Sequence, residues 1–122
     1  MFRPRSVALI GASGRPNSFG ATVMKNLLTG GFDGPIMPVN PKYPSIQGVL
    51  AYPDVASLPQ VPDLAVICTP PATVPRLIAD LSVRGTKAAI VLTAGLDVTS
   101  GNGTTNQQDM LNAAHPNAMR IL

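Results

Sequence analysis

The sequence predicts an α/β fold with a doubly wound parallel sheet, with all 122 residues in a single domain. Short runs of apolar, often β-branched residues alternate with stretches that carry apolar residues at helical spacing. Most of the apolar runs end in turns of Gly, Ser, Thr, Ala and Pro. Such runs are typical of parallel strands buried on both faces by helices. Because strands alternate with helices, we expect right-handed crossovers and a Rossmann-like arrangement.

Five apolar segments are expected to be the strands. Pro38 in the second segment lacks a backbone donor, so this strand must either have an exposed edge or end early. The fifth segment reaches the last residue, and we therefore expect the chain to be the N-terminal fragment of a longer multidomain protein. The expected strands span residues 6–10, 35–39, 64–68, 87–93 and 119–122.

Helices are expected between these strands. The first should begin near Ser18 and stop at Gly30 and Gly31, and the second should close at Gly85. Another helix is expected at 107–114, and a short one near 54–58 within a Pro-rich stretch that runs from 40 to 62. The apolar positions at helical spacing are Phe19, Val23, Met24, Leu27 and Leu28 in the first helix, and Val74, Leu77, Ile78 and Leu81 in the second.

Composition excludes several classes of function. The net charge of +3 comes from scattered charges, and the chain has no Trp, so we expect no nucleic-acid binding. No apolar run approaches the roughly 18 residues that span a bilayer, so we expect no membrane partner. The single cysteine, Cys68, permits no internal disulfide and no Cys-rich metal site. We therefore expect a soluble cytoplasmic protein without a metal.

The loop after the first strand is the strongest candidate for ligand binding. In a sheet of this type, ligands bind outside the carboxyl ends of the strands. The loop runs from Gly11 to Gly20 and is longer than the G-x-G-x-x-G dinucleotide fingerprint. It carries a hydroxyl at Ser13 and a cation at Arg15, which suit phosphate oxygens. The helix that begins near Ser18 directs free N–H groups at the same place.

The end of the second strand distinguishes between nucleotide ligands. An NAD domain usually has Asp or Glu there to accept from the ribose hydroxyls. This chain reads Val39-Asn40-Pro41-Lys42, with a cation and no carboxylate. Lys42 therefore disfavours NAD and favours a ligand with an extra phosphate near the ribose. NADP carries that phosphate at the 2′ position and coenzyme A (CoA) carries it at the 3′ position.

No residue is predicted to be catalytic. His115 precedes Pro116 at a helix end, where capping or solvent contact is more common than catalysis. Cys68 lies in an expected buried strand and is interpreted as a core residue, because a reactive thiol needs exposure and a positive environment. Asp97 follows the turn after the fourth strand, where Asp is also a common turn residue.

The order and spacing of several short motifs resemble the CoA-binding domain of NDP-forming acyl-CoA synthetases. The resemblance covers nearly the whole chain and implies that residues 1–122 form a CoA-binding domain. Its motifs are Gly11-Ala12-Ser13, Gly20, Gly30-Gly31-Phe32-x-Gly34, Val39-Asn40-Pro41-Lys42, Gly48-Val49, Pro53-Asp54, Leu58-Pro59, Pro62-Asp63-Leu64-Ala65-Val66 and Ala94-Gly95.

Within this superfamily the chain looks most like the synthetase-like N-terminal region of bacterial protein lysine acetyltransferases. The motifs that carry this likeness lie in residues 15–35 and 50–59. In those proteins the domain is implied to bind acyl-CoA, such as acetyl-CoA, as a regulatory element, while the transfer to lysine occurs on another domain. In the synthetases the same domain presents CoA to a phosphohistidine on a later domain.

The resemblance also implies a set of ligand contacts. Two departures matter. Distant relatives such as succinyl-CoA synthetase have Thr-Glu-Gly where this chain has Thr93-Ala94-Gly95. Many close relatives continue with Gly-Phe-x-Glu, where this chain reads Gly95-Leu96-Asp97-Val98 and offers only the shorter acid Asp97, one position earlier. The implied contacts are Gly11, Ser13, Arg15 and Gly20 for phosphate or ribose, Val39, Asn40 and Lys42 for the nucleotide end, and Thr69, Pro70, Thr93, Ala94 and Gly95 for the pantetheine side.

Three functions remain open at this stage. The first is a CoA or acyl-CoA binding module that regulates a lysine acetyltransferase through downstream domains of the same polypeptide. The second is the CoA-presenting part of an ADP-forming acyl-CoA ligase. The third is an NAD(P)-binding redox domain, which the missing acid after the second strand disfavours. The sequence does not decide whether the protein forms a homo-oligomer.

Overall fold

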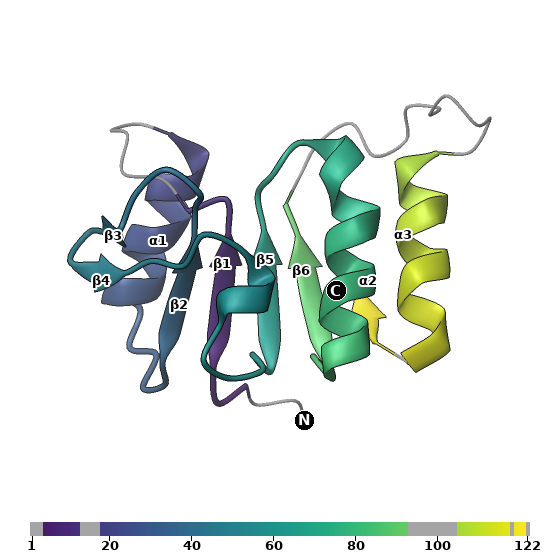
Figure 1. Ribbon diagram of the computed structural model, residues 1–122. Coiled ribbons are helices and arrows are strands. Elements are labelled where there is room, and N and C mark those ends of the chain that lie inside the picture. The colour runs from purple at the N-terminus through teal and green to yellow at the C-terminus, as the bar shows by residue number, and fades with distance from the viewer. Residues whose placement is uncertain (1–3, 13–17, 93–104, 118, 122) are drawn as a thin grey trace.

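A parallel sheet of five strands forms the centre of the computed structural model, which describes residues 4–12, 18–92, 105–117 and 119–121. The strand order is β2-β1-β5-β6-β7, so the chain builds outward from β1 first on one side and then on the other (Figure 1). This order confirms the predicted doubly wound sheet. The strands are β1 (Val7–Ile10), β2 (Ile36–Val39), β5 (Leu64–Ile67), β6 (Ala88–Val91) and β7 (Arg120–Ile121).

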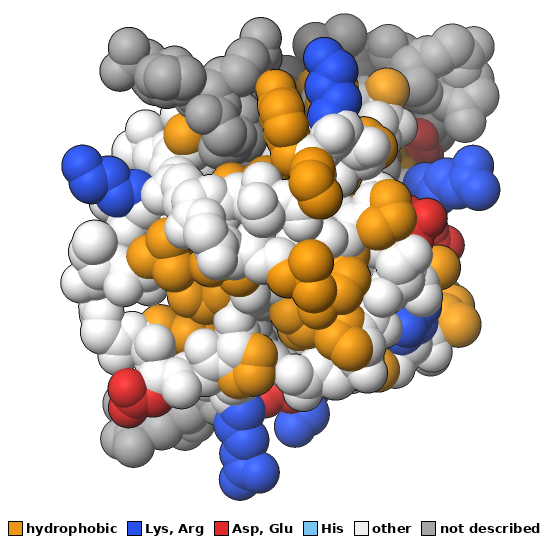
Figure 2. Space-filling view, turned by 60° about the vertical axis from the view of Figure 1, so that its left-hand side comes forward, with side chains coloured by type: hydrophobic (Ala, Val, Ile, Leu, Met, Phe, Trp, Pro, Cys, Tyr) orange, Lys and Arg blue, Asp and Glu red, His pale blue; other side chains and the backbone are white. Residues whose placement is uncertain are grey.

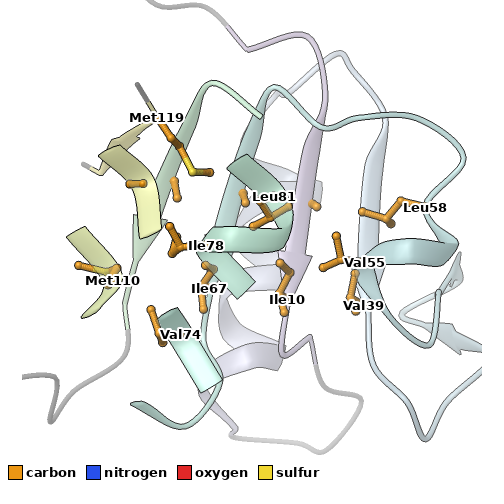
Figure 3. Close-up of a cluster of buried hydrophobic side chains, with 14 of the residues drawn as sticks. Ile10, Val39, Val55, Leu58, Ile67, Val74, Ile78, Leu81, Met110 and Met119 are labelled. Atoms are coloured by element: carbon orange, nitrogen blue, oxygen red, sulfur yellow. The ribbon is translucent and has the colours of Figure 1, made fainter. Parts of the chain in front are cut away.

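Helices cover both faces of the sheet because alternate strand residues point to opposite sides. Helix α1 (Phe19–Thr29) packs on one face, where its Met24 lies in a buried cluster with Leu9 and Val66. Helices α2 (Val74–Arg84) and α3 (Asn106–Ala114) lie side by side on the other face (Figure 1). There Ile10, Ile67, Ile78 and Met110 belong to a second cluster (Figure 3).

The helix ends follow the predicted signals. The Ser18 hydroxyl accepts from the Ala21 backbone N–H over 3.2 Å, which caps the start of α1. Gly85 closes α2 with φ of 106°, and its N–H donates to the Leu81 carbonyl over 3.1 Å. Thr105 caps α3, which begins at Asn106, one residue before the predicted start at 107.

Strand β2 lies at an edge of the sheet, as Pro38 requires. The Pro38 carbonyl accepts from the Tyr52 N–H over 2.9 Å, and the Tyr52 carbonyl accepts from Asn40 N–H over 2.9 Å. In a strand, the N and O of one residue face the same side. The missing N–H of Pro38 therefore faces away from β1, and the ladder between β1 and β2 loses no bond.

A small hairpin, absent from the sequence prediction, lies beside α1 in Figure 1. Strands β3 (Ser45–Ile46) and β4 (Val49–Leu50) are joined by Gln47 and Gly48, both with positive φ. Ile46 is buried in the cluster on the α1 face, and the Gln47 side chain donates to the Ala21 carbonyl over 2.9 Å. The hairpin therefore extends the cover of that face.

Short 3-10 turns complete the fold. The short helix predicted near 54–58 is the 3-10 turn η1 (Val55–Ser57), which is capped by the Asp54 carboxylate. Two further turns, η2 (Pro71–Thr73) and η3 (His115–Asn117), lead into α2 and out of α3. Val55 and Leu58 pack against the sheet on the same face as α2 (Figure 3).

Candidate functional site

The carboxyl ends of the parallel strands β1, β2 and β5 lie next to one another. We call this end of the sheet, where the strands finish, the carboxyl edge. Gly11 follows β1, Asn40 and Lys42 follow β2, and Thr69 follows β5. These residues are far apart in the sequence, and the strand order β2-β1-β5 places their turns next to one another. This is the position at which doubly wound sheets bind ligands.

Gly11 marks a close approach between the ends of β1 and β5. Its φ is +93°, and its N–H donates to the Val39 carbonyl over 3.1 Å. A Cβ at this residue would lie 3.0 Å from the carbonyl carbon of Cys68 and 3.2 Å from Cγ2 of Thr69. Glycine is therefore required here for both its backbone conformation and its lack of a side chain.

Asn40 links the turns after β1 and β2. Its Nδ2 donates to the Ala12 carbonyl over 2.6 Å, and its Oδ1 accepts from the Lys42 backbone N–H over 2.7 Å. Lys42 is exposed beside this linkage. The polar turn after β2 thus presents a cation and an engaged amide, and no carboxylate.

The turn after β5 leads directly into α2. The Thr73 hydroxyl lies 2.7 Å from Oγ1 of Thr69 and 2.6 Å from the Pro70 carbonyl oxygen. These contacts hold the Thr69-Pro70-Pro71 turn compact. Because α2 begins at Val74, its N-terminus lies at the carboxyl edge as well.

A cavity of about 640 Å³ opens at this edge, on the face covered by α2. This volume falls within the range of small-molecule sites. Ile10, Val39 and Val55 belong to its apolar wall, and Figure 3 shows them near one another. The complete lining is Ile10, Gly11, Val39, Pro41, Pro53, Asp54, Val55, Ala56, Thr69, Ala72, Thr73, Arg76, Leu77 and Asp80.

The structure unites part of the predicted site. Gly11, Val39 and Thr69 line the cavity, and Asn40 and Lys42 flank its Pro41. Pro70 belongs to the adjoining turn, and Gly20 is buried in the first turn of α1. The remaining predicted residues, Ser13, Arg15, Thr93, Ala94 and Gly95, lie outside the described residues, as does Asp97.

Three charged cavity residues were absent from the sequence prediction. Asp54 uses its Oδ1 to accept from the Ser57 N–H and hydroxyl, over 2.9 and 2.7 Å. Arg76 and Asp80 lie four residues apart on α2 and both line the cavity. Their i, i+4 spacing places the two on one face of α2, but no local pattern shows that this face meets the cavity.

The other candidates lie away from the cavity. Cys68 is half-buried, packs with the cluster on the α1 face, and has a pKa raised by desolvation. His115 is exposed at the end of α3, where the chain returns to the start of β7.

Among the described residues, no helix is long and apolar enough to cross a membrane. The same residues contain no group of three His, Cys, Asp or Glu that could hold a metal ion.

On the face shown in Figure 2, the Lys and Arg side chains of the described residues are not gathered into one patch. Figure 2 views the molecule from the side of the hairpin and the β2 edge. Lys and Arg side chains in this view are spread around the periphery, and hydrophobic side chains occupy much of the centre. A long anionic polymer would find no continuous basic stripe on this face.

The parallel sheet, the helices on both faces and the cavity at the carboxyl edge define a Rossmann-like α/β domain. Residues 5–122 match the family model described as a CoA binding domain. The chain therefore belongs to the CoA-binding domain family found in ADP-forming acyl-CoA synthetases.

Several curated proteins similar to this chain are named as CoA ligases or synthases. The alpha subunit of ADP-forming acetate–CoA ligase II from Pyrococcus furiosus is 36% identical over 121 residues, which cover 99% of this chain and 26% of that subunit. A trans-feruloyl-CoA synthase from an unknown prokaryotic organism is 38% identical over 110 residues, covering 90% of this chain and 16% of the synthase.

A solved structure shows the same fold. The apo form of dinucleotide-forming acetyl-coenzyme A synthetase 1 from Ca. Korarchaeum cryptofilum matches with a TM-score of 0.87 and 34% identity, over 99% of this chain and 26% of that one. The chain thus spans about a quarter of this synthetase and of the Pyrococcus subunit. All three of these relatives are named as ligases or synthetases, and none of the three is named as a lysine acetyltransferase, the class to which the sequence motifs liken the chain.

Proposed function

We propose that this chain binds CoA at its carboxyl edge, as the CoA-presenting module of an ADP-forming acyl-CoA ligase. The family match over residues 5–122 carries the proposal. The chemistry of the edge fits the ligand, because the turn after β2 offers Lys42 and an engaged amide where an NAD domain would have a free carboxylate. The cavity beside that turn has room for part of a nucleotide.

Each end of CoA has candidate partners. Lys42 would pair with the 3′-phosphate, and Val39 and its apolar neighbours in the cavity would contact the nucleotide end. The N-terminus of α1, with Gly11, Ser13, Arg15 and Gly20, would hold the phosphate oxygens. Thr69, Pro70, Thr93, Ala94 and Gly95 would face the pantetheine arm.

The chain would supply binding and orientation, not the chemical step. CoA brings the thiol that becomes acylated, and this chain would hold the nucleotide end so that the thiol reaches a reacting group on another part of the protein. We assign the chemical step to no residue of the cavity, and the half-buried Cys68 packs on the opposite face. The acyl group would be chosen elsewhere, as the acetate and feruloyl names of the relatives suggest.

The first test compares the thermal midpoint of the protein with saturating CoA, acetyl-CoA, NAD and NADP. A ligand at 100 times its Kd stabilises the folded state by about 2.7 kcal/mol. For a domain of this size we expect CoA and acetyl-CoA to raise the midpoint by about 10 °C. A shift with NAD or NADP, and none with CoA, would refute the proposal.

The second test concerns Lys42. A charge-assisted contact to phosphate is worth about 1.5 kcal/mol, so Lys42→Ala should weaken CoA about tenfold. The affinity for 3′-dephospho-CoA should change by less than about twofold, because the partner phosphate is already missing. Calorimetric titration measures both affinities. The control is Lys87→Ala, because Lys87 is exposed just before β6, at the opposite end of the strands. Equal losses for both ligands would remove Lys42 from this role.

For the full-length protein, the ligase and the acetyltransferase predict different reactions. An ADP-forming ligase joins a carboxylic acid to CoA as ATP is converted to ADP and phosphate; in reverse, acyl-CoA, ADP and phosphate give the free acid, CoA and ATP. An acetyltransferase instead moves the acetyl group from acetyl-CoA to a protein lysine and releases CoA. We expect the first activity. Acetyl transfer without phosphate-dependent ATP formation would restore the acetyltransferase as the parent function.

A further inference from the structure

Asn40 fastens three backbone segments at the carboxyl edge. Its Nδ2 donates to the Ala12 carbonyl over 2.6 Å, across 28 positions of sequence. Its Oδ1 accepts from the Lys42 N–H over 2.7 Å, and its own N–H donates to the Tyr52 carbonyl over 2.9 Å. The side chain is half-buried, where competition from water is reduced.

These bonds join the two segments that the proposed site assigns to phosphates. Ala12 leads into the loop that contains Ser13 and Arg15, and Lys42 carries the cation proposed for the 3′-phosphate. One amide therefore fixes the distance between the start of the loop and the turn of Lys42. A ligand that contacts both segments binds with less loss of conformational freedom when they are already held together.

We infer that Asn40 is a positioning residue for CoA, which acts by holding the Ala12 carbonyl and the Lys42 backbone in one arrangement. This inference rests on the proposed function and replaces a direct nucleotide contact as the main role of Asn40. It also gives a physical reason for an amide at the end of β2. An ionised carboxylate cannot donate to the Ala12 carbonyl, so the Asp that an NAD domain has at this position could not make the linkage.

A double-mutant cycle tests the coupling between Asn40 and Lys42. We expect Asn40→Ala to weaken CoA about tenfold, as does Lys42→Ala. Because Lys42 is no longer held in place without Asn40, the double variant should lose much less than about 100-fold. Asn112→Ala, in an exposed position of α3, is the control substitution and should leave CoA affinity unchanged.

The variant Asn40→Asp separates the two halves of the linkage. It keeps an oxygen that accepts from the Lys42 N–H and loses the donor to Ala12. At pH 7 we expect CoA affinity about tenfold below that of the wild type. Protonation restores an O–H donor, so the ratio to the wild type at the same pH should recover as the pH falls toward about 4. A purely structural defect would not recover on acidification.

Amide hydrogen exchange supplies a readout that needs no ligand. The Lys42 N–H should exchange about tenfold faster in the Asn40→Ala variant and stay protected in Asn40→Asp. If the affinity losses of the two single variants multiply in the double variant while the wild type binds CoA normally, the positioning role is wrong and the proposed function stands. If the wild type fails to bind CoA, the proposed function falls and the positioning role falls with it. Accelerated Lys42 exchange would then describe a linkage of the fold only.

Discussion

Side-chain hydrogen bonds hold segments of the chain together at both ends of the parallel strands, at the carboxyl edge and at the opposite end, which we call the amino edge. At the amino edge, the Asp63 carboxylate accepts from the Arg5 backbone N–H over 2.8 Å, and Ser6 Oγ accepts from the Asp63 N–H over 3.1 Å. At the carboxyl edge, Asn40 makes bonds of 2.6 and 2.7 Å to the Ala12 and Lys42 backbone. In both places a side chain joins segments that are distant in the sequence.

The edges differ in the space next to these bonds. The carboxyl edge has a cavity and an exposed cation at Lys42, whereas backbone fills the amino edge at Gly34, which lies against the Arg5 carbonyl. Side-chain fastening by itself therefore does not mark a ligand site. Its combination with open space and suitable charge does. Substitutions at the two edges should accordingly separate stability from ligand binding.

The largest loss of stability is expected from Gly34→Ala at the amino edge. A Cβ there would collide with the Arg5 carbonyl oxygen and lie 2.8 Å from Cζ of Phe32. The contact is with backbone, which cannot rotate away, so we expect unfolding free energy to fall by about 3 kcal/mol. Urea denaturation measures this loss. The Kd for CoA of the folded protein should change by less than about threefold, and a larger change would break the distinction between the edges.

Gly11→Ala is expected to lose less stability than Gly34→Ala and more CoA affinity. Its positive φ and the contact of 3.0 Å with Cys68 should cost about 2 kcal/mol. Any shift of Gly11 also moves Ala12 and the loop that follows, so CoA should bind at least about tenfold more weakly. Gly31→Ala is the matched control, because Gly31 has φ of +82° and open space around its Cβ position.

The control isolates the cost of backbone conformation. Gly31→Ala should lose about 1 kcal/mol of stability and leave CoA affinity unchanged. Equal effects of the two substitutions on CoA binding would show that the contact at Gly11 does not shape the site.

The fold was predictable from apolar patterns that extend over whole strands and helices. The buried strands and the helices were predicted to within two residues in most cases, because an apolar stripe or run must face the core wherever the segment lies. The hairpin β3–β4 carries no such signal, since strands of two residues are too short to show alternation. Its form depends on tertiary contacts of Ile46 and Gln47 with the α1 face.

The site was predictable only where topology alone decides position. Gly11, Val39 and Thr69 follow or end strands, so a parallel sheet must bring them together. The placement of Arg76 depends on how α2 is rotated about its axis, and the bonds of Asn40 depend on distances across 28 residues. Neither is encoded in a local pattern. As ligand contacts, all the site residues stay predictions, and Ser13, Arg15 and residues 93–95 also lie outside the described residues.

The smallest effect on stability is expected at Cys68, which tests whether its thiol lies on the buried α1 face and not in the ligand site. Its thiol packs with the cluster on the α1 face, and desolvation raises its pKa. Because the thiolate is the reactive form, a disulfide reagent at pH 8 should modify the folded protein at least about tenfold more slowly than the urea-unfolded chain. The raised pKa also predicts a slight loss of stability as pH rises above about 8.5, the value for an unfolded thiol. Cys68→Ala should abolish that loss. Reaction as fast in the folded protein as in urea would place the thiol in an exposed, activated setting and reopen it as a nucleophile of the site.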